Sequence, residues 1–317
     1  MATAVKSFDL IGKKEAVSDF ISLITPSDTP FLSSLKTEKI TNTLYSWMED
    51  QLRAEADNAK IEGADATDSD RDQPSMKENR VQILEETFKV SGTAEAVKTY
   101  GREGAVARET MKTGKLLKMD LEFALVGRDQ ATAVAHAGAT AGRFKNVRNM
   151  IHADTKTAMT QAADDAGVAS KITEAAIMGT HEKLYNAGSD AGTLQVKPSV
   201  TKDIAAFSQA STRTQNIDVS DKKITNVINV YESPFGTVRI VKNRRLYDPA
   251  AAAGAKAGSD AILYDASNWK LMVLRDWFRE KLARTGDADR WQVIGEFGLK
   301  HINEKASALI TGINGYT

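Results

Sequence analysis

Residues 102–130 form the longest run in the chain whose pattern indicates a helix. Apolar and small residues recur there at steps of three and four, which places them on one stripe of a 3.6-residue helix. The stripe holds Val106, Thr110, Thr113, Leu117, Leu121, Ala124 and Leu125. Lys112, Lys115 and Lys118 lie on a different stripe, which we expect to face solvent. Gly104 and Gly114 would each cost a helix interior up to about 1 kcal/mol relative to alanine, which predicts a closely approaching neighbour.

Composition limits the classes of protein that this chain can belong to. A length of 317 residues with 42% hydrophobic content suffices for a substantial core, in one elaborated domain or two. The 42 basic and 42 acidic residues cancel, so net charge does not mark a polyanion-binding protein. There is no cysteine, which excludes disulfides and thiol chemistry and is compatible with a reducing cytoplasm. The sequence shows neither a signal-peptide pattern nor a membrane-spanning apolar run.

The first 80 residues read as an arm followed by an acidic excursion. Residues 1–48 mix short apolar clusters with Pro26 and Pro30, and only residues 15–24 have a helical pattern. This arm packs either along its own domain or across another subunit. Residues 49–80 are rich in Asp and Glu and nearly free of large apolar residues, so we expect an extended loop. Strand-like runs bracket this stretch, with those at 81–84 and 87–90 following it, so the acidic stretch is predicted to be the long loop of a two-stranded protrusion.

One part of the acidic loop partly matches a calcium-binding motif. Asp68, Asp70 and Asp72 occupy the first three ligand positions of such a loop. The match fails at Gln73, where the turn requires glycine, and at Asn79, where a bidentate glutamate is required. We therefore expect solvated carboxylates and no bound metal.

A short basic patch follows the predicted long helix. Residues 131–142 are almost entirely alanine, threonine and glycine, which suits either tight packing or a flexible crossover. Residues 143–148 then combine Arg143, Lys145 and Arg148 with Phe144. Because the patch lacks the repeated aromatic residues that stack on bases, we do not expect sequence-specific nucleic-acid recognition.

The second half mixes helices and strands. Residues 171–187 have a helical pattern that Gly188 is placed to end, with one face marked by Ile172, Ala175, Ala176, Gly179, Lys183 and Leu184. A strand at 193–198 and a helix at 200–208 follow. Two β-rich runs at 223–231 and 237–242 flank Ser233-Pro-Phe-Gly236, whose residue types favour a type I turn, so we predict a hairpin.

The last part of the chain returns to a β pattern. An alanine- and glycine-rich connection at 249–258 precedes strands predicted at 269–274 and 291–296, with turn chemistry at 285–287. Residues 276–283 fit a helix or a strand equally well.

No recognised catalytic or cofactor motif occurs in the sequence. Glycine-rich phosphate loops, zinc-protease helices and nucleophile elbows are all absent. The histidines are scattered and form no ligand pair: His136, His152, His181 and His301. We therefore expect that the protein is not an enzyme and that it binds no cofactor or metal. Folding can still bring distant residues together into a site.

An ordered series of short stretches resembles a known family. The series contains Asp28-Thr-Pro-Phe-Leu-Ser-Ser-Leu35, Thr173-Glu-Ala-Ala176 with Leu184-Tyr-Asn-Ala-Gly188, Tyr231-Glu-Ser-Pro-Phe-Gly-Thr-Val-Arg-Ile-Val-Lys-Asn-Arg244, and Leu282-Ala-Arg-Thr-Gly-Asp287 leading to Glu296-Phe-Gly-Leu299 and Asn303. Together these stretches resemble tailed-phage major capsid proteins of the HK97-like fold, in the group that resembles the phage SU10 major capsid protein. The resemblance extends from about residue 8 to about residue 313.

The resemblance implies an α+β fold with five segments. They are an N-terminal arm at 1–48, an extended E-loop hairpin at 49–90, a P-domain segment with a long spine helix at 91–144, an A-domain at 145–255, and a return to the P-domain sheet at 256–317. The implied function is a virion protein, assembled in the host cytoplasm, that forms the pentamers and hexamers of an icosahedral head around double-stranded DNA. The implied partners are a portal, a decoration protein and a scaffolding protein, the last expected to be separate because the arm begins close to Met1.

Two sets of charged side chains are expected to make contacts in an assembled shell. The acidic loop is expected to pair with cationic patches of a neighbouring subunit through Asp65, Asp68, Asp70 and Asp72. Non-specific phosphate contacts to packaged DNA are expected from Lys112, Lys115, Lys118, Arg143 and Arg148. A tail-tube or decoration protein would also suit an arm, a hairpin loop and a β core, and an enzyme without a recognised motif is the remaining class.

Overall fold

The computed structural model describes residues 25–53, 55–63, 65–66, 71, 73–97, 104–159, 171–210, 230–248, 259–284 and 286–313. The predicted helix at 15–24 and the connection at 249–258 lie outside these residues. Contacts divide the chain into two compact units. The first contains Glu86–Leu116 and Arg279–Val293, and the second contains Asp28–Glu85, Leu117–Phe278 and Ile294–Thr317. Among the described residues, no helix is both long and apolar enough to cross a membrane.

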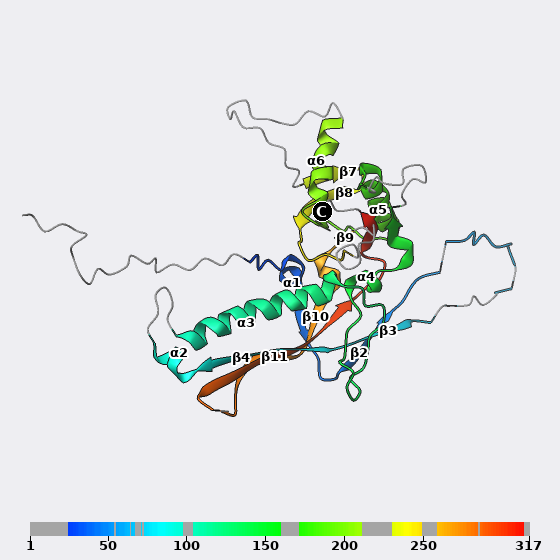
Figure 1. The fold of residues 1–317 in the computed structure, drawn as a ribbon. Helices are drawn as coiled ribbons and strands as arrows, with labels where there is room; N and C mark the ends of the chain where they lie inside the picture. The colour runs from blue at the N-terminus through cyan, green and yellow to red at the C-terminus, as the bar shows by residue number, and fades with distance from the viewer. Residues whose placement is uncertain are drawn as a thin grey trace, which may run out of the picture. The chain divides into compact units, whose positions relative to one another are not determined.

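The predicted long helix is α3, Ala105–Glu122, which continues as a π-helical turn, η2, Phe123–Gly127 (Figure 1). The predicted core stripe is confirmed in its second half, where the buried residues are Thr113, Leu117, Leu121, Ala124 and Leu125. Gly104 lies just before the helix with φ +60°, so the expectation that it weakens the helix interior is wrong. Gly114 does lie inside the helix, but no described atom comes within 4 Å of the position of an added Cβ. The predicted close neighbour of Gly114 is therefore missing among the described residues.

Four strands form one sheet, in the order β1-β10-β11-β4. They are β1 Lys36–Lys39, β10 Trp269–Leu282, β11 Ala288–His301 and β4 Gln82–Ser91. The ambiguous run 276–283 lies almost entirely in β10, and the two short runs predicted at 81–84 and 87–90 merge into the single strand β4. Gly286 has φ +73° between β10 and β11, which confirms the predicted turn. The helix α2, Gly92–Ala96, follows β4.

A two-stranded ribbon encloses the acidic loop. β2, Leu44–Glu49, pairs antiparallel with β3, Ser75–Arg80, from Leu44↔Arg80 to Glu49↔Ser75. The prediction that the acidic stretch is the long loop of a two-stranded protrusion is confirmed. The strand that follows the loop is β3, whereas the predicted runs at 81–84 and 87–90 belong to β4. The ribbon and the loop are visible in blue and cyan in Figure 1.

A six-stranded sheet has the order β5-β12-β9-β6-β8-β7. Its strands are β5 Lys156–Ala158, β12 Ala308–Ile313, β9 Ser259–Tyr264, β6 Thr193–Val196, β8 Gly236–Lys242 and β7 Val230–Ser233. The predicted hairpin is confirmed where the structure describes it, with Ser233 opposite Gly236. Residues 256–317 divide between both sheets, because β9 and β12 join the six-stranded sheet whereas β10 and β11 join the four-stranded one.

Two helices pack on this six-stranded sheet. They are α5, Glu174–Asn186, and α6, Val200–Ala210, and Gly188 with φ +80° follows the end of α5 as predicted. The buried face of α5 differs from the predicted one, because it contains Ile177, Thr180, His181 and Leu184 whereas Ala175 and Lys183 are exposed. The helices share a core with Leu194, Val238, Ile240 and Ile310 of the sheet.

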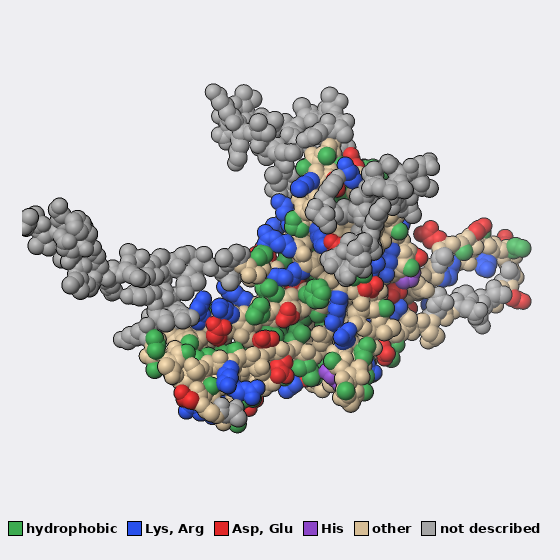
Figure 2. All heavy atoms as spheres, viewed as in Figure 1, with side chains coloured by type: hydrophobic (Ala, Val, Ile, Leu, Met, Phe, Trp, Pro, Cys, Tyr) green, Lys and Arg blue, Asp and Glu red, His purple; other side chains and the backbone are tan. Residues whose placement is uncertain are grey.

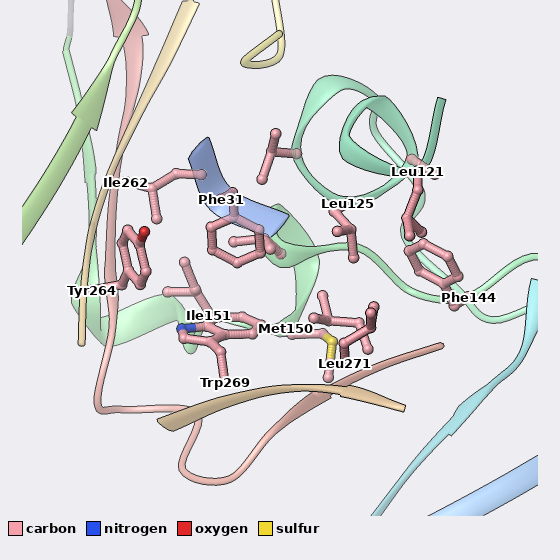
Figure 3. Close-up of a cluster of buried hydrophobic side chains, with 14 of the residues drawn as sticks. Phe31, Leu121, Leu125, Phe144, Met150, Ile151, Ile262, Tyr264, Trp269 and Leu271 are labelled. Carbon is pink, nitrogen blue, oxygen red and sulfur yellow. The ribbon is translucent and has the colours of Figure 1, made fainter. Parts of the chain in front are cut away.

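A second hydrophobic cluster surrounds the short helix α1, Pro30–Ser34 (Figure 3). Phe31 is completely buried, with its ring centroid 5.2 Å from that of Tyr264 and 5.9 Å from that of Trp269. The remaining short helices are α4 Val147–Met150, η3 Ala153–Thr155 and η4 Ala266–Asn268. The small-residue run at 131–142 folds back on itself through the isolated bridges Val134↔Arg143 and Ala137↔Thr140. Because Phe31 is buried in this cluster, α1 anchors the first described residues of the chain in the core of the second unit.

Candidate assembly contacts and buried carboxylates

The acidic loop extends from a firmly attached base. Asn79 on β3 is fully buried, and its side-chain amide donates to the carbonyls of Leu299 at 2.8 Å and Lys145 at 3.1 Å. The hydroxyl of Tyr45 on β2 also donates to the Leu299 carbonyl, at 2.8 Å. Lys77 forms a 2.8 Å ion pair with Glu304. The base of the ribbon is therefore attached to the rest of the second unit by hydrogen bonds and an ion pair.

The loop presents exposed carboxylates and exposed apolar side chains. Asp65 is exposed, whereas Asp68, Asp70 and Asp72 lie outside the described residues. Leu52 is 96% exposed and Ile61 is 84% exposed. On the ribbon, Met48 and Met76 face each other across the strands and are also exposed. Figure 2 shows Asp and Glu side chains on this protruding loop. The loop and ribbon thus carry charge and apolar surface that the chain itself leaves uncovered.

All five predicted cationic residues remain at least partly accessible. Lys115, Lys118 and Arg143 are exposed, and Lys112 is partly exposed beside Glu109, 3.1 Å away. Figure 2 shows cationic, acidic and hydrophobic side chains mixed on the visible face, so the cations form no single uninterrupted patch there.

Arg148 has a different environment from the other four. Its Nη1 atom donates to Oδ2 of Asp260 at 2.5 Å, its Nε atom lies 3.6 Å from Oδ2 of Asp129, and its guanidinium carbon lies 4.5 Å above the Tyr247 ring. Asp260 is only 2% exposed. We remove Arg148 from the expected DNA contacts, because α4 and β9 bring its charge against a buried carboxylate 112 residues away.

A buried glutamate that the sequence reasoning missed connects α1 to the end of α3. Glu122 is fully buried and accepts hydrogen bonds from the backbone amides of Phe31, at 3.0 Å, and Leu32, at 2.7 Å. It also accepts from the side-chain amide of Asn243 at 2.7 Å. Desolvation raises the pKa of Glu122, and these three donors oppose that rise. An acidic residue in the last turn of a helix interacts unfavourably with the helix dipole. The position of Glu122 was therefore the feature of the sequence that could have indicated a specific partner for its carboxylate.

The glutamate belongs to a longer buried network. Asn243 donates to the side chain of Gln195 on β6 at 3.1 Å, and Gln195 donates to the hydroxyl of Tyr264 on β9 at 2.8 Å. That hydroxyl lies 3.0 Å from the Ser34 hydroxyl in α1. The network therefore joins α1, the end of α3 and two strands of the six-stranded sheet.

Two of the four histidines, His181 and His301, have structural roles in the fold. Nδ1 of His181 lies 2.7 Å from the Ser233 hydroxyl, but that hydroxyl donates to the Gly236 carbonyl and accepts from the Phe235 amide. It therefore fixes the hairpin turn and is not poised as a nucleophile. His301 stacks on Trp269 at 3.8 Å, and burial lowers its pKa to about 3. Within the described residues, no three potential ligand side chains gather in a way that could hold a metal ion.

Comparisons with known proteins agree with this architecture. Residues 3–314 match the family model described as the SU10 major capsid protein. The major capsid protein of Escherichia phage Phieco32 is 28% identical over 350 residues, which cover 97% of this chain and 96% of that protein.

Solved structures share the fold at low sequence identity. The capsid structure of cyanophage P-SCSP1u matches with a TM-score of 0.62 and 12% identity, over 99% of this chain and 96% of that one. The SrpI encapsulin of Synechococcus elongatus PCC 7942 matches with a TM-score of 0.60 and 8% identity, over 96% of this chain and 95% of that one. These likenesses show an HK97-like fold. With the family match over nearly its whole length, the chain belongs to the SU10 major capsid protein family.

Proposed function

We propose that this phage capsid protein assembles into the pentamers and hexamers of an icosahedral head that encloses double-stranded DNA. The observation that carries the proposal is the anchored β2–β3 ribbon with its exposed apolar side chains. Leu52, Ile61, Met48 and Met76 are 64–96% exposed in the isolated chain. Exposed apolar surface of this extent, held out on a firm base, favours coverage by a neighbouring copy.

We propose domain roles for five segments of the chain. We assign residues 1–48 to the N-terminal arm, 49–90 to the E-loop, 91–144 to the P-domain with α3 as its spine helix, and 145–255 to the A-domain. We assign β10 and β11 of residues 256–317 to the P-domain sheet, whereas β9 and β12 complete the A-domain sheet. Assembly in the host cytoplasm with a scaffolding protein, a portal and a decoration protein is part of the same proposal.

The assembly proposal predicts closed shells formed by the purified chain. Electron microscopy is expected to show polyhedral shells, because the ribbon and loop of one copy would cover a neighbour. Replacing Asp65, Asp68, Asp70 and Asp72 together by asparagine is expected to lower shell yield and to weaken its dependence on salt concentration, since the loop's charge then no longer attracts cationic surface.

A control for charge removal outside the loop replaces two exposed aspartates, Asp28 and Asp276, by asparagine. This variant is expected to keep the wild-type yield and salt dependence. Tubes in place of shells would favour a tail-tube protein, and a compact particle of small defined mass would reopen the enzyme class. Unchanged yield and salt dependence in the loop variant would remove the loop carboxylates from the proposed contact.

The DNA contacts predict a measurable change in salt dependence. We propose Lys112, Lys115, Lys118 and Arg143 as non-specific phosphate contacts on the inner face of the shell. Replacing Lys115 and Lys118 by alanine is expected to reduce the slope of log K against log salt for duplex DNA by about 1 per lost contact. Lys202→Ala on α6 removes an exposed lysine outside this set and is expected to leave the slope unchanged. An equal slope in the double variant and the wild type would exclude these lysines from the contact.

A further inference from the structure

Arg148 lies between two carboxylates from different parts of the second unit. Asp260 on β9 is buried and binds Nη1 at 2.5 Å, whereas Asp129, after η2, is exposed and lies 3.6 Å from Nε. The Tyr247 ring beneath the guanidinium supports it through a cation–π contact at 4.5 Å. The Arg148 guanidinium can therefore remain within reach of both carboxylates while its hydrogen bond to one weakens and its hydrogen bond to the other strengthens.

The buried carboxylate is only half satisfied. Oδ1 of Asp260 has no hydrogen-bond partner among the described residues, although it is shielded from solvent. A buried anionic oxygen without a donor is costly, and taking up a proton removes that cost. The unpartnered Oδ1 is therefore the atom on which we expect a proton to bind.

The site joins three segments through the backbone as well. The Asp260 amide donates to the Tyr247 carbonyl at 3.1 Å, and the Tyr247 amide donates to the carbonyl of Val126, in the π-helical turn, at 2.9 Å. Arg148 itself lies on α4. Asp260 lies on β9 of the six-stranded sheet. A change in its protonation would therefore occur close to the π-helical turn that ends the long helix.

The charged groups around the site set its response to pH. Burial raises the pKa of Asp260 to about 7, against the lowering effect of Arg148, while Asp129 raises this pKa and Lys156 of β5 lowers it. The pKa of Lys156 is lowered by its own burial and then by the like charges of Arg148 and Lys145. The charge of Asp260 therefore changes close to neutral pH.

We propose that Arg148 is a pH-dependent pivot, which binds Asp260 while that carboxylate is charged and shifts to Asp129 when Asp260 is protonated. In the first state the guanidinium ties α4 to β9. In the second state it ties α4 to the segment that follows η2. The fold thus contains two alternative links at the end of the long helix.

The direction of the stability change follows from proton linkage. The unfolded pKa of an aspartate is about 3.9, which lies below the folded value of about 7. Between these values the folded chain holds a proton that the unfolded chain has released. The contribution of Asp260 is therefore fully present below about pH 4 and is lost as pH rises through about 7.

The test is thermal unfolding of the full-length chain between about pH 5 and about pH 8. Asp260→Asn is expected to remove the fall in Tm that the wild type shows across neutral pH. Asp129→Asn is the decisive variant, because a pivot makes Arg148 depend on Asp129 only when Asp260 is protonated. Its loss of Tm relative to the wild type is expected to be larger at the acidic end of the range.

A second readout keeps the test independent of folding yield. Infrared difference spectra of the folded wild type are expected to show a protonated-carboxyl band that grows below neutral pH and is absent from Asp260→Asn. Arg148→Lys retains the charge and is expected to retain the band. An equal effect of Asp129→Asn at both ends of the range, or a band that persists in Asp260→Asn, would overturn the pivot.

Discussion

Replacing Glu122 by alanine is expected to destabilise the second unit by about 3–5 kcal/mol. The substitution leaves the amides of Phe31 and Leu32 and the side-chain amide of Asn243 without their acceptor. Each unsatisfied buried donor costs about 1–3 kcal/mol, and the three costs are not fully additive because one carboxylate serves all of them. Denaturant unfolding followed by tryptophan fluorescence measures the loss.

Two further substitutions separate the hydrogen bonds from the helix itself. Asp120→Ala removes an exposed carboxylate from the same helix and is expected to change stability by less than about 0.5 kcal/mol. Glu122→Gln keeps one acceptor oxygen but places an amide group where the second carboxylate oxygen accepted a hydrogen bond. Its loss of stability is therefore expected to lie between those of the other two variants. A loss below about 1 kcal/mol for Glu122→Ala would show that the carboxylate does not hold α1.

Replacing Phe31 by alanine is expected to cost about 3–5 kcal/mol, the usual cost of emptying a buried phenylalanine site. Phe31 is completely buried between the rings of Tyr264 and Trp269, and short helices have little stability of their own. The loss is expected to release α1, which would appear as faster amide hydrogen exchange at residues 31–35 than elsewhere in the second unit.

The matched control for this substitution is Phe123→Ala. Phe123 is 51% exposed in the π-helical turn, so its removal is expected to cost about 1 kcal/mol or less. Combining Phe31→Ala with Glu122→Ala is expected to cost less than the sum of the two, because both side chains hold the same short helix. Full additivity, or equal losses for the two phenylalanines, would contradict the anchoring role of α1.

The features that could be predicted from sequence are those set by neighbouring residues. The core stripe of α3, the Ser233–Gly236 turn, the glycine after α5 and the ribbon around the acidic loop all depend on short-range periodicity or turn chemistry. The family resemblance was also readable, because it rests on an ordered series of short stretches. Local patterns were insufficient for β10, since its second half fits both periods and only pairing within the sheet makes it a strand.

The sequence alone determined the main helix, the hairpin turn, the acidic ribbon and the family. Only the tertiary structure decided that α5 buries His181 beside Leu184 of the predicted face, that Arg148 is paired, and that Glu122 holds α1. The partners concerned are separated by 91 residues for Glu122 and Phe31 and by 112 for Arg148 and Asp260. Local periodicity reports which face of an element is apolar. Which distant group satisfies a buried charge depends on how the sheets and helices pack.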